Sequence, residues 1–158
     1  MNERRKFITH LSALLVSGPV AAFAEQAGAG KGPLVRVWKS PTCGCCSKWV
    51  DHMIAAGFEV EAENVSDVGV YKQRYGLPVK LASCHTAVVE GYVVEGHVPP
   101  ADVIRLLKEK PPIGGIAVPG MPMGSPGMES PNPENYQTIA FDKDQRLSVF
   151  AEHGPDFD

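Results

Sequence analysis

Three of the four cysteines of this chain lie within four residues, between a short apolar segment and a stretch with helical periodicity. Residues 34–39 predict a strand, and residues 47–56 predict a helix. The cysteines Cys43, Cys45 and Cys46 therefore fall on a strand-to-helix turn, in the first turn of the helix. Backbone N–H groups there have no intrahelical partner and the helix dipole favours negative charge, so thiolates are favoured over thiols. Thiolates are both nucleophiles and ligands of soft metals.

Size and charge restrict the classes of protein that fit. The chain has 158 residues and a formal net charge of −3, which predicts a single domain with a modest core. Basic residues do not cluster with interleaved aromatic residues, so we expect no nucleic-acid partner.

Residues 1–24 predict a signal peptide. A basic segment with Arg4 and Arg5 precedes an apolar run that is too short and too polar to span a membrane. A small-x-small site predicts cleavage near Ala24-Glu25, which leaves no membrane span in the mature chain. The paired arginines resemble a twin-arginine signal, with an ordinary secretory signal as the alternative. We therefore expect an exported protein.

The following residues predict one folded domain behind a leader. Residues 25–33, rich in Gly, Ala and Lys, predict a flexible leader. The apolar patterns in residues 34–110 predict the order strand, helix, strand, helix, hairpin, helix, over 34–39, 47–56, 58–65, 67–75, 86–95 and 100–110. One parallel crossover followed by an antiparallel hairpin and a helix is the thioredoxin-like α/β arrangement. Cys43 and Cys46 have the C-x-x-C spacing of a redox pair in that fold.

Residues 111–158 predict an extension to this domain. Residues 111–135 are rich in Pro, Gly and Met, so we expect a loop there, without a helix or a central strand. Residues 136–141 and 146–150 alternate apolar and polar residues on either side of a polar turn and predict a terminal hairpin.

Export into an oxidising compartment makes structural disulfides one interpretation of the cysteines. The spacing argues against it, because a bridge between any two of the first three cysteines closes a very short loop and constrains little of the unfolded chain.

The segments Cys43-Gly44-Cys45-Cys46 and Ser83-Cys84-His85-Thr86 resemble those of a known family. With further stretches at 49–52, 95–99 and 118–122, the chain resembles the CopG-like periplasmic copper-resistance proteins, whose domain was long catalogued as of unknown function. The resemblance implies a thioredoxin-like fold, a periplasmic location, copper bound through the cysteine cluster and a role in copper resistance. A proposed activity in the family is interconversion of Cu(I) and Cu(II).

In a thioredoxin-like fold, the segment before the third strand packs against the N-terminus of the first helix. Thioredoxins place a cis-proline in that segment, whereas this chain has Cys84 there. We therefore predict a four-sulfur metal site formed by Cys43, Cys45, Cys46 and Cys84. Cu(I) fits these ligands, with bridging sulfurs and more than one ion, and zinc is the competitor although the spacing fits it less well.

Other donors lie close in sequence to the expected site. His85 follows Cys84 and could bind Cu(II), although alternation along an extended segment would point it away from the thiol. For His97, a backbone hydrogen bond is the more favoured interpretation. Thioether sulfurs of the Pro- and Gly-rich loop are candidate auxiliary Cu(I) ligands, with packing as the alternative: Met121, Met123 and Met128.

Three functions fit these predictions. The first is copper binding for sequestration, or as a copper oxidoreductase that cycles the metal between its oxidation states. The second is a thiol–disulfide oxidoreductase with Cys43 as nucleophile and Cys46 as resolving thiol. The third is a metallochaperone that delivers copper to another copper-handling protein of the periplasm.

Overall fold

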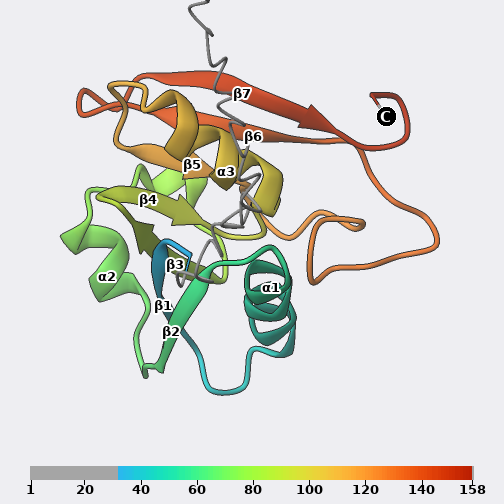
Figure 1. Ribbon diagram of the computed structural model, residues 1–158, viewed down its shortest axis with the longest axis horizontal. Helices are drawn as coiled ribbons and strands as arrows, with labels where there is room; N and C mark the ends of the chain where they lie inside the picture. The colour runs from blue at the N-terminus through green and yellow to red at the C-terminus, as the bar shows by residue number, and fades with distance from the viewer. Residues whose placement is uncertain (1–31, 158) are drawn as a thin grey trace, which may run out of the picture.

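The computed structural model describes residues 32–157, as a mixed α/β protein built on one sheet (Figure 1). The predicted signal peptide at 1–24, and all but the last two residues of the predicted leader at 25–33, lie outside the described residues. The elements follow the order β1 (Leu34–Lys39), α1 (Gly44–Ala55), β2 (Glu59–Asn64), α2 (Gly69–Arg74), the 3₁₀ turn η1 (Val79–Leu81), β3 (His85–Val89), β4 (Tyr92–Glu95), α3 (Pro100–Glu109), β5 (Gly115–Ala117), β6 (Tyr136–Phe141) and β7 (Leu147–His153). Across residues 32–157, no helix has the length and apolar character needed to cross a bilayer.

The seven strands form a single sheet in the order β2-β1-β3-β4-β5-β6-β7. β1 pairs in parallel with β2 and antiparallel with β3, and β3 pairs antiparallel with β4. This is the predicted order of elements, with ends that differ by a few residues. The difference that matters lies in α1, which begins at Gly44, so that Cys45 and Cys46 belong to the helix and Cys43 is its N-cap.

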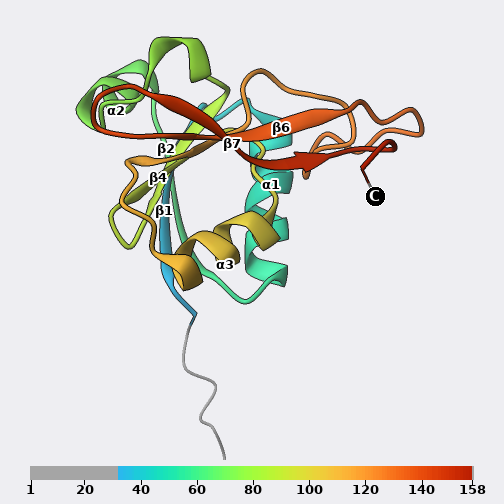
Figure 2. The same cartoon turned by 90° about the horizontal axis from the view of Figure 1, so that it is seen from above.

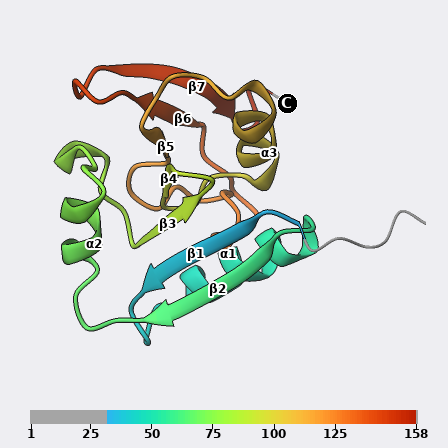
Figure 3. The same cartoon turned by 60° about the vertical axis from the view of Figure 1, so that its left-hand side comes forward.

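Helices cover both faces of the sheet. α1 and α3 lie on one face and α2 on the other (Figures 2 and 3). The alternation along β4 reflects this arrangement, because Val94 packs with Trp49 of α1 and Leu106 of α3, whereas its neighbour Val93 packs with Leu81 near α2. The cysteine turn at the start of α1 therefore lies at one end of a core that is closed on both sides.

The prediction that residues 111–135 contain no central strand is wrong at β5. Gly115–Ala117 pairs in parallel with β4 and antiparallel with β6, between the domain strands and the terminal hairpin. Proline removes a backbone donor only at its own position, and these three residues include none. The terminal hairpin, confirmed as β6 and β7, consequently continues the main sheet, and residues 118–135 form the loop that connects β5 to it.

Candidate metal centre

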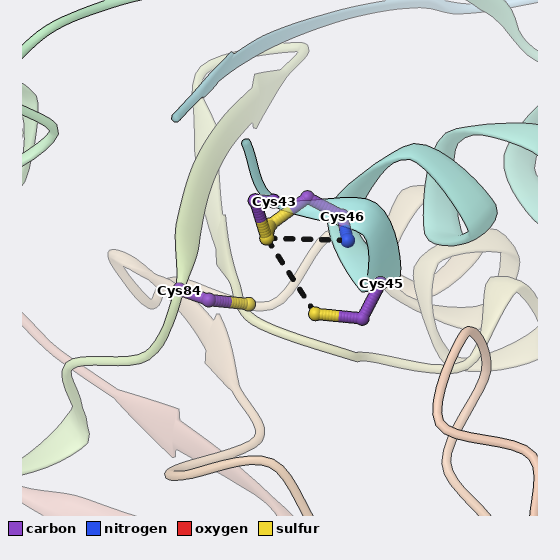
Figure 4. Close-up of side chains that lie close together, drawn as sticks. All are labelled: Cys43, Cys45, Cys46 and Cys84. Carbon is purple, nitrogen blue, oxygen red and sulfur yellow. Dashed lines mark hydrogen bonds between the residues drawn. A yellow bond between two sulfur atoms is a disulfide. The ribbon is translucent and has the colours of Figure 1, made fainter. Parts of the chain in front are cut away.

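The four cysteines come together at the N-terminus of α1. The sulfur atoms of Cys43, Cys45, Cys46 and Cys84 all lie within 4.8 Å of one another. Figure 4 shows Cys84 reaching from the loop before β3 toward the turn that carries the other three. The structure thus places Cys84 beside the turn, as the sequence predicted, while the role of the four residues as ligands stays a prediction.

Two of these sulfurs form a disulfide. Cys43 and Cys46 are bridged, with Cα atoms 5.3 Å apart, whereas Cys45 and Cys84 are free thiols. Cys46 is completely buried and Cys43 is partly exposed. Cys43 Sγ also accepts a hydrogen bond from the Cys46 N–H at 3.3 Å and lies 3.5 Å from Cys45 Sγ. The bridge withdraws two thiols from the four-sulfur set, so the complete set exists only in the reduced protein.

A second donor set shares Cys84. Its sulfur lies 3.0 Å from His97 Nε2 and 3.3 Å from His85 Nδ1. His97 donates its Nδ1–H to the carbonyl of Pro126 at 2.8 Å, which leaves the Nε2 lone pair directed at the Cys84 thiol. Ligating histidines commonly use their other nitrogen in this way, because it fixes the tautomer and the ring orientation.

The backbone hydrogen bond favoured for His97 is confirmed, from Nδ1 to Pro126, and the register of the hairpin accounts for its second contact, with Cys84. β3 and β4 are joined by the two residues between Val89 and Tyr92, and Thr86 pairs with Glu95. Continuing this register by two residues places Cys84 opposite His97. The register of the hairpin could therefore have found this histidine.

The expected orientation of His85 was wrong. Cys84 lies just outside β3, which begins at His85, so its place opposite His97 follows from the register while strict alternation does not fix the direction of its side chain. The His85 ring is fully buried, 4.4 Å from the Trp49 ring and 5.3 Å from the His97 ring between centroids. Its Nε2 has no hydrogen-bond partner among the described residues. The structure thus holds an imidazole beside the cysteines in an apolar environment.

The surroundings of Cys84, His85 and His97 disfavour the charged forms of these side chains. Burial, reinforced by the charge of Cys45, raises the pKa of Cys84 to about 11. Burial lowers the pKa of His97, and it lowers the pKa of His85 well below the usual value. Near neutral pH the metal-free site therefore holds a protonated Cys84 thiol and two neutral imidazoles.

The loop between β5 and β6 closes over the start of α1. Gly127 has φ +89°, and a Cβ there would lie 2.6 Å from the carbonyl oxygen of Cys45. Glu129 fixes the end of this segment, with one carboxylate oxygen 2.6 Å from His52 Nε2 and accepting the Gly127 N–H at 2.7 Å. The site consequently has a wall formed by residues far along the chain.

The methionines lie on this loop at different depths. Met121 and Met123 are 51% and 41% exposed, and Met128 is partly buried next to Gly127. Their part in metal binding stays a prediction.

The fold and this cluster define a class: a mixed α/β protein with a sulfur- and imidazole-lined site able to hold a metal. Residues 81–128 match DUF411, described as a protein family of unknown function. The solved structure named copper resistance protein CopG, form 2, is 41% identical, with a TM-score of 0.74 over 78% of this chain and 99% of that chain. Form 1 is also 41% identical, with a TM-score of 0.73 over 77% of this chain and 98% of that one. No curated protein matches the chain. The chain belongs to the CopG family of copper resistance proteins, which confirms the resemblance seen in the sequence.

Proposed function

We propose that this chain is an exported copper-binding protein that holds Cu(I) through the thiolates of Cys43, Cys45, Cys46 and Cys84. The observation that carries the proposal is the convergence of four sulfurs within 4.8 Å. Thiolates select Cu(I) and also suit zinc, and membership of a copper-resistance family favours copper. Sequestration, or interconversion of Cu(I) and Cu(II), is the role in copper resistance that this site would serve.

The proposal includes the framework and location of the site. Residues 34–110 are proposed to be a thioredoxin-like unit, supported by the strand order β2-β1-β3-β4 with α1 and α3 on one face and α2 on the other. Residues 111–158 are an extension that supplies the wall of the site. The signal peptide predicted at 1–24 would deliver the protein to the periplasm.

More than one copper ion is proposed to bind. Four thiolates within 4.8 Å are close enough to bridge neighbouring ions. The imidazoles of His85 and His97 add nitrogen donors on the Cys84 side, and these suit Cu(II) better than sulfur alone. Met121, Met123 and Met128 are proposed as auxiliary thioether ligands on the loop.

The decisive experiment is an anaerobic titration with Cu(I), in competition with a Cu(I) chelator. The mature chain is compared in two forms, fully reduced and with the Cys43–Cys46 disulfide intact. We expect the reduced form to bind more than one ion, with mainly sulfur ligands by X-ray absorption. The disulfide form should bind more weakly, because two of the four sulfurs are unavailable. A reduced chain that withdraws no copper from the chelator would refute the proposal.

The disulfide favours one alternative, a thiol–disulfide oxidoreductase. Cys43 is the accessible sulfur of the bridge and Cys46 the buried one, which matches the roles of nucleophile and resolving thiol. The test is reduction of a disulfide substrate by the reduced, metal-free chain. This alternative requires the wild-type rate to exceed that of the Cys43→Ser, Cys46→Ser variant.

A further inference from the structure

The carboxylate of Glu95, on β4, is completely buried and accepts a hydrogen bond from Lys72 of α2, so it lies on the face of the sheet that this helix covers. One of its oxygens accepts hydrogen bonds from Lys72 Nζ at 2.5 Å and from the Ser83 N–H at 2.6 Å. The other accepts from Thr86 Oγ1 at 2.7 Å. Lys72 comes from α2, and Thr86 lies opposite Glu95 on β3. A helix, a strand and a loop therefore meet on one carboxylate.

Fold stability is a weak reason for such a pair. Removing two charges from water is expensive, and apolar side chains of similar size often serve equally well. Apolar side chains cannot replace the acceptors for the Thr86 hydroxyl and the Ser83 N–H, and the second of these donors belongs to the loop immediately before Cys84.

Ser83 is held on more than one side. Its hydroxyl donates to the carbonyl of Gly120, directly before Met121. Gly96, with φ +71°, has no room for a side chain, since a Cβ there would lie 2.6 Å from the Ser83 side chain. The backbone of Glu95 adds to this, because its carbonyl accepts the Val118 N–H at 3.0 Å. Glu95 thus fixes the Cys84 loop and the start of the methionine loop together.

Cys84 needs such a support more than the other cysteines. Cys45 and Cys46 lie in α1 and Cys43 is its N-cap, so the helix itself sets their spacing. Cys84 is brought to them by a loop, and its sulfur must stay beside both the turn and His97. Metal sites require ligands held to within roughly 0.5 Å, which a loop achieves only when its backbone is anchored.

We infer that Glu95 is a positioning residue of the metal centre, which sets the place of Cys84 by accepting the Ser83 N–H while Lys72 neutralises its charge. The inference rests on the proposed function, since it assigns the support of that same site. Glu95 acts through the loop, because the hydrogen bonds of its carboxylate come from Lys72, Ser83 and Thr86 and not from the proposed ligands.

Two double variants of the mature chain separate the effect of the acceptor that positions the Ser83 backbone from the effect of the Lys72 and Glu95 charges. Lys72→Met with Glu95→Gln removes both charges and keeps an oxygen that can accept the Ser83 N–H. Lys72→Met with Glu95→Met has a similar volume and no charge, but it lacks the acceptor. An exposed ion pair of the same sheet, 3.2 Å between Arg36 Nε and Glu61 Oε2, provides the control variant Arg36→Met with Glu61→Gln.

The readouts are Cu(I) affinity by chelator competition, the sulfur-to-copper charge-transfer spectrum and the unfolding temperature. We expect the Gln variant and the control to keep wild-type affinity and spectrum. The Met variant should lose affinity by about tenfold or more and change its spectrum. Wild-type behaviour of the Met variant overturns the inference, and so does a loss of affinity in the Gln variant. If the Met variant does not fold, the Gln variant decides alone. A wild-type chain that binds no copper overturns the proposed function instead.

Discussion

At the scale of single residues, Cys84 differs most from its neighbours. It is the one cysteine outside the turn, and its thiol contacts both imidazoles of the site. Because it belongs to both donor sets, its loss should affect every metal ion that the proposed cluster would hold.

We predict that Cys84→Ser weakens Cu(I) binding by more than about tenfold and leaves the fold intact. The hydroxyl replaces a half-buried sulfur of slightly larger size, so packing changes little. Chelator competition measures the affinity, and thermal unfolding of the metal-free chain checks the fold. Ser47→Ala, in the first turn of α1, is the matched control. Retained affinity in Cys84→Ser would exclude a site that converges on this thiol.

The pH dependence of binding follows from the same residue. The pKa of Cys84 is about 11, so the thiol carries a proton in the metal-free protein, and copper must displace it. Affinity should therefore rise as pH rises from about 6 to about 8, by about tenfold per pH unit for each proton released. The lowered pKa values of His85 and His97 keep these imidazoles neutral, so we expect no proton from them in this range. Titrations at several pH values measure the slope, which should be shallower in Cys84→Ser. A slope unchanged by this substitution would contradict the prediction.

Sequence reasoning found the four cysteines because thiols are rare and their chemistry is specific. It found neither the buried hydrogen bonds of Glu95 nor the contact between His97 and Cys84. Both depend on which strands pair and in which register, and the type of a single residue does not reveal which residue lies opposite it. The preference for the thiolate was predicted for the three cysteines of the helical turn. Cys84 lies outside the helix, and its burial raises the pKa of its thiol.

At the scale of elements, the contact between α1 and the closing loop is electrostatic. The hydrogen bond from His52, followed by the Gly127 N–H, lowers the pKa of Glu129 to about 2. A carboxylate with a lowered pKa contributes stability above its usual pKa of 4.5, and that contribution disappears as pH falls through the folded value. Glu129 is 52% exposed, so solvent screens the pair and limits it to less than about 1 kcal/mol.

We therefore predict that Glu129→Gln lowers the unfolding temperature slightly at neutral pH and leaves it unchanged near pH 2. Asp51→Asn, an exposed substitution on the same helix, is the control. Calorimetry at both pH values measures the effect. A difference that persists near pH 2 would mean that the carboxylate acts through packing instead of charge.

The elements themselves were largely predictable, with one instructive exception. Segments such as α3 and β6 are long enough for their apolar residues to show the period of a helix or a strand. β5 has three residues, too few to show a period, and it exists as a strand because β4 and β6 provide partners on both sides.

At the scale of the whole molecule, β5 joins the predicted domain and its extension into one sheet. We predict that a chain ending at Lys110 fails to fold, because it loses the core residues Ile116, Ala140 and Phe141 and exposes the edge of β4. Circular dichroism and size-exclusion chromatography compare it with the chain that continues to Asp158. A soluble, cooperatively folding truncation would show that residues 34–110 are autonomous.

The separation of the cysteines along the chain also determines the order in which the donors of the site come together during folding. Cys43, Cys45 and Cys46 are neighbours in every conformation, including a chain that is still being synthesised. Cys84, His97 and the carbonyl of Pro126 join them only after β1, β3 and β4 have paired and the loop has closed. Metal that meets the unfolded chain finds three thiols without their surroundings, whereas metal that meets the folded and reduced chain finds the complete site. Whether the chain has already folded when it meets a metal ion therefore decides which set of donor atoms the ion encounters.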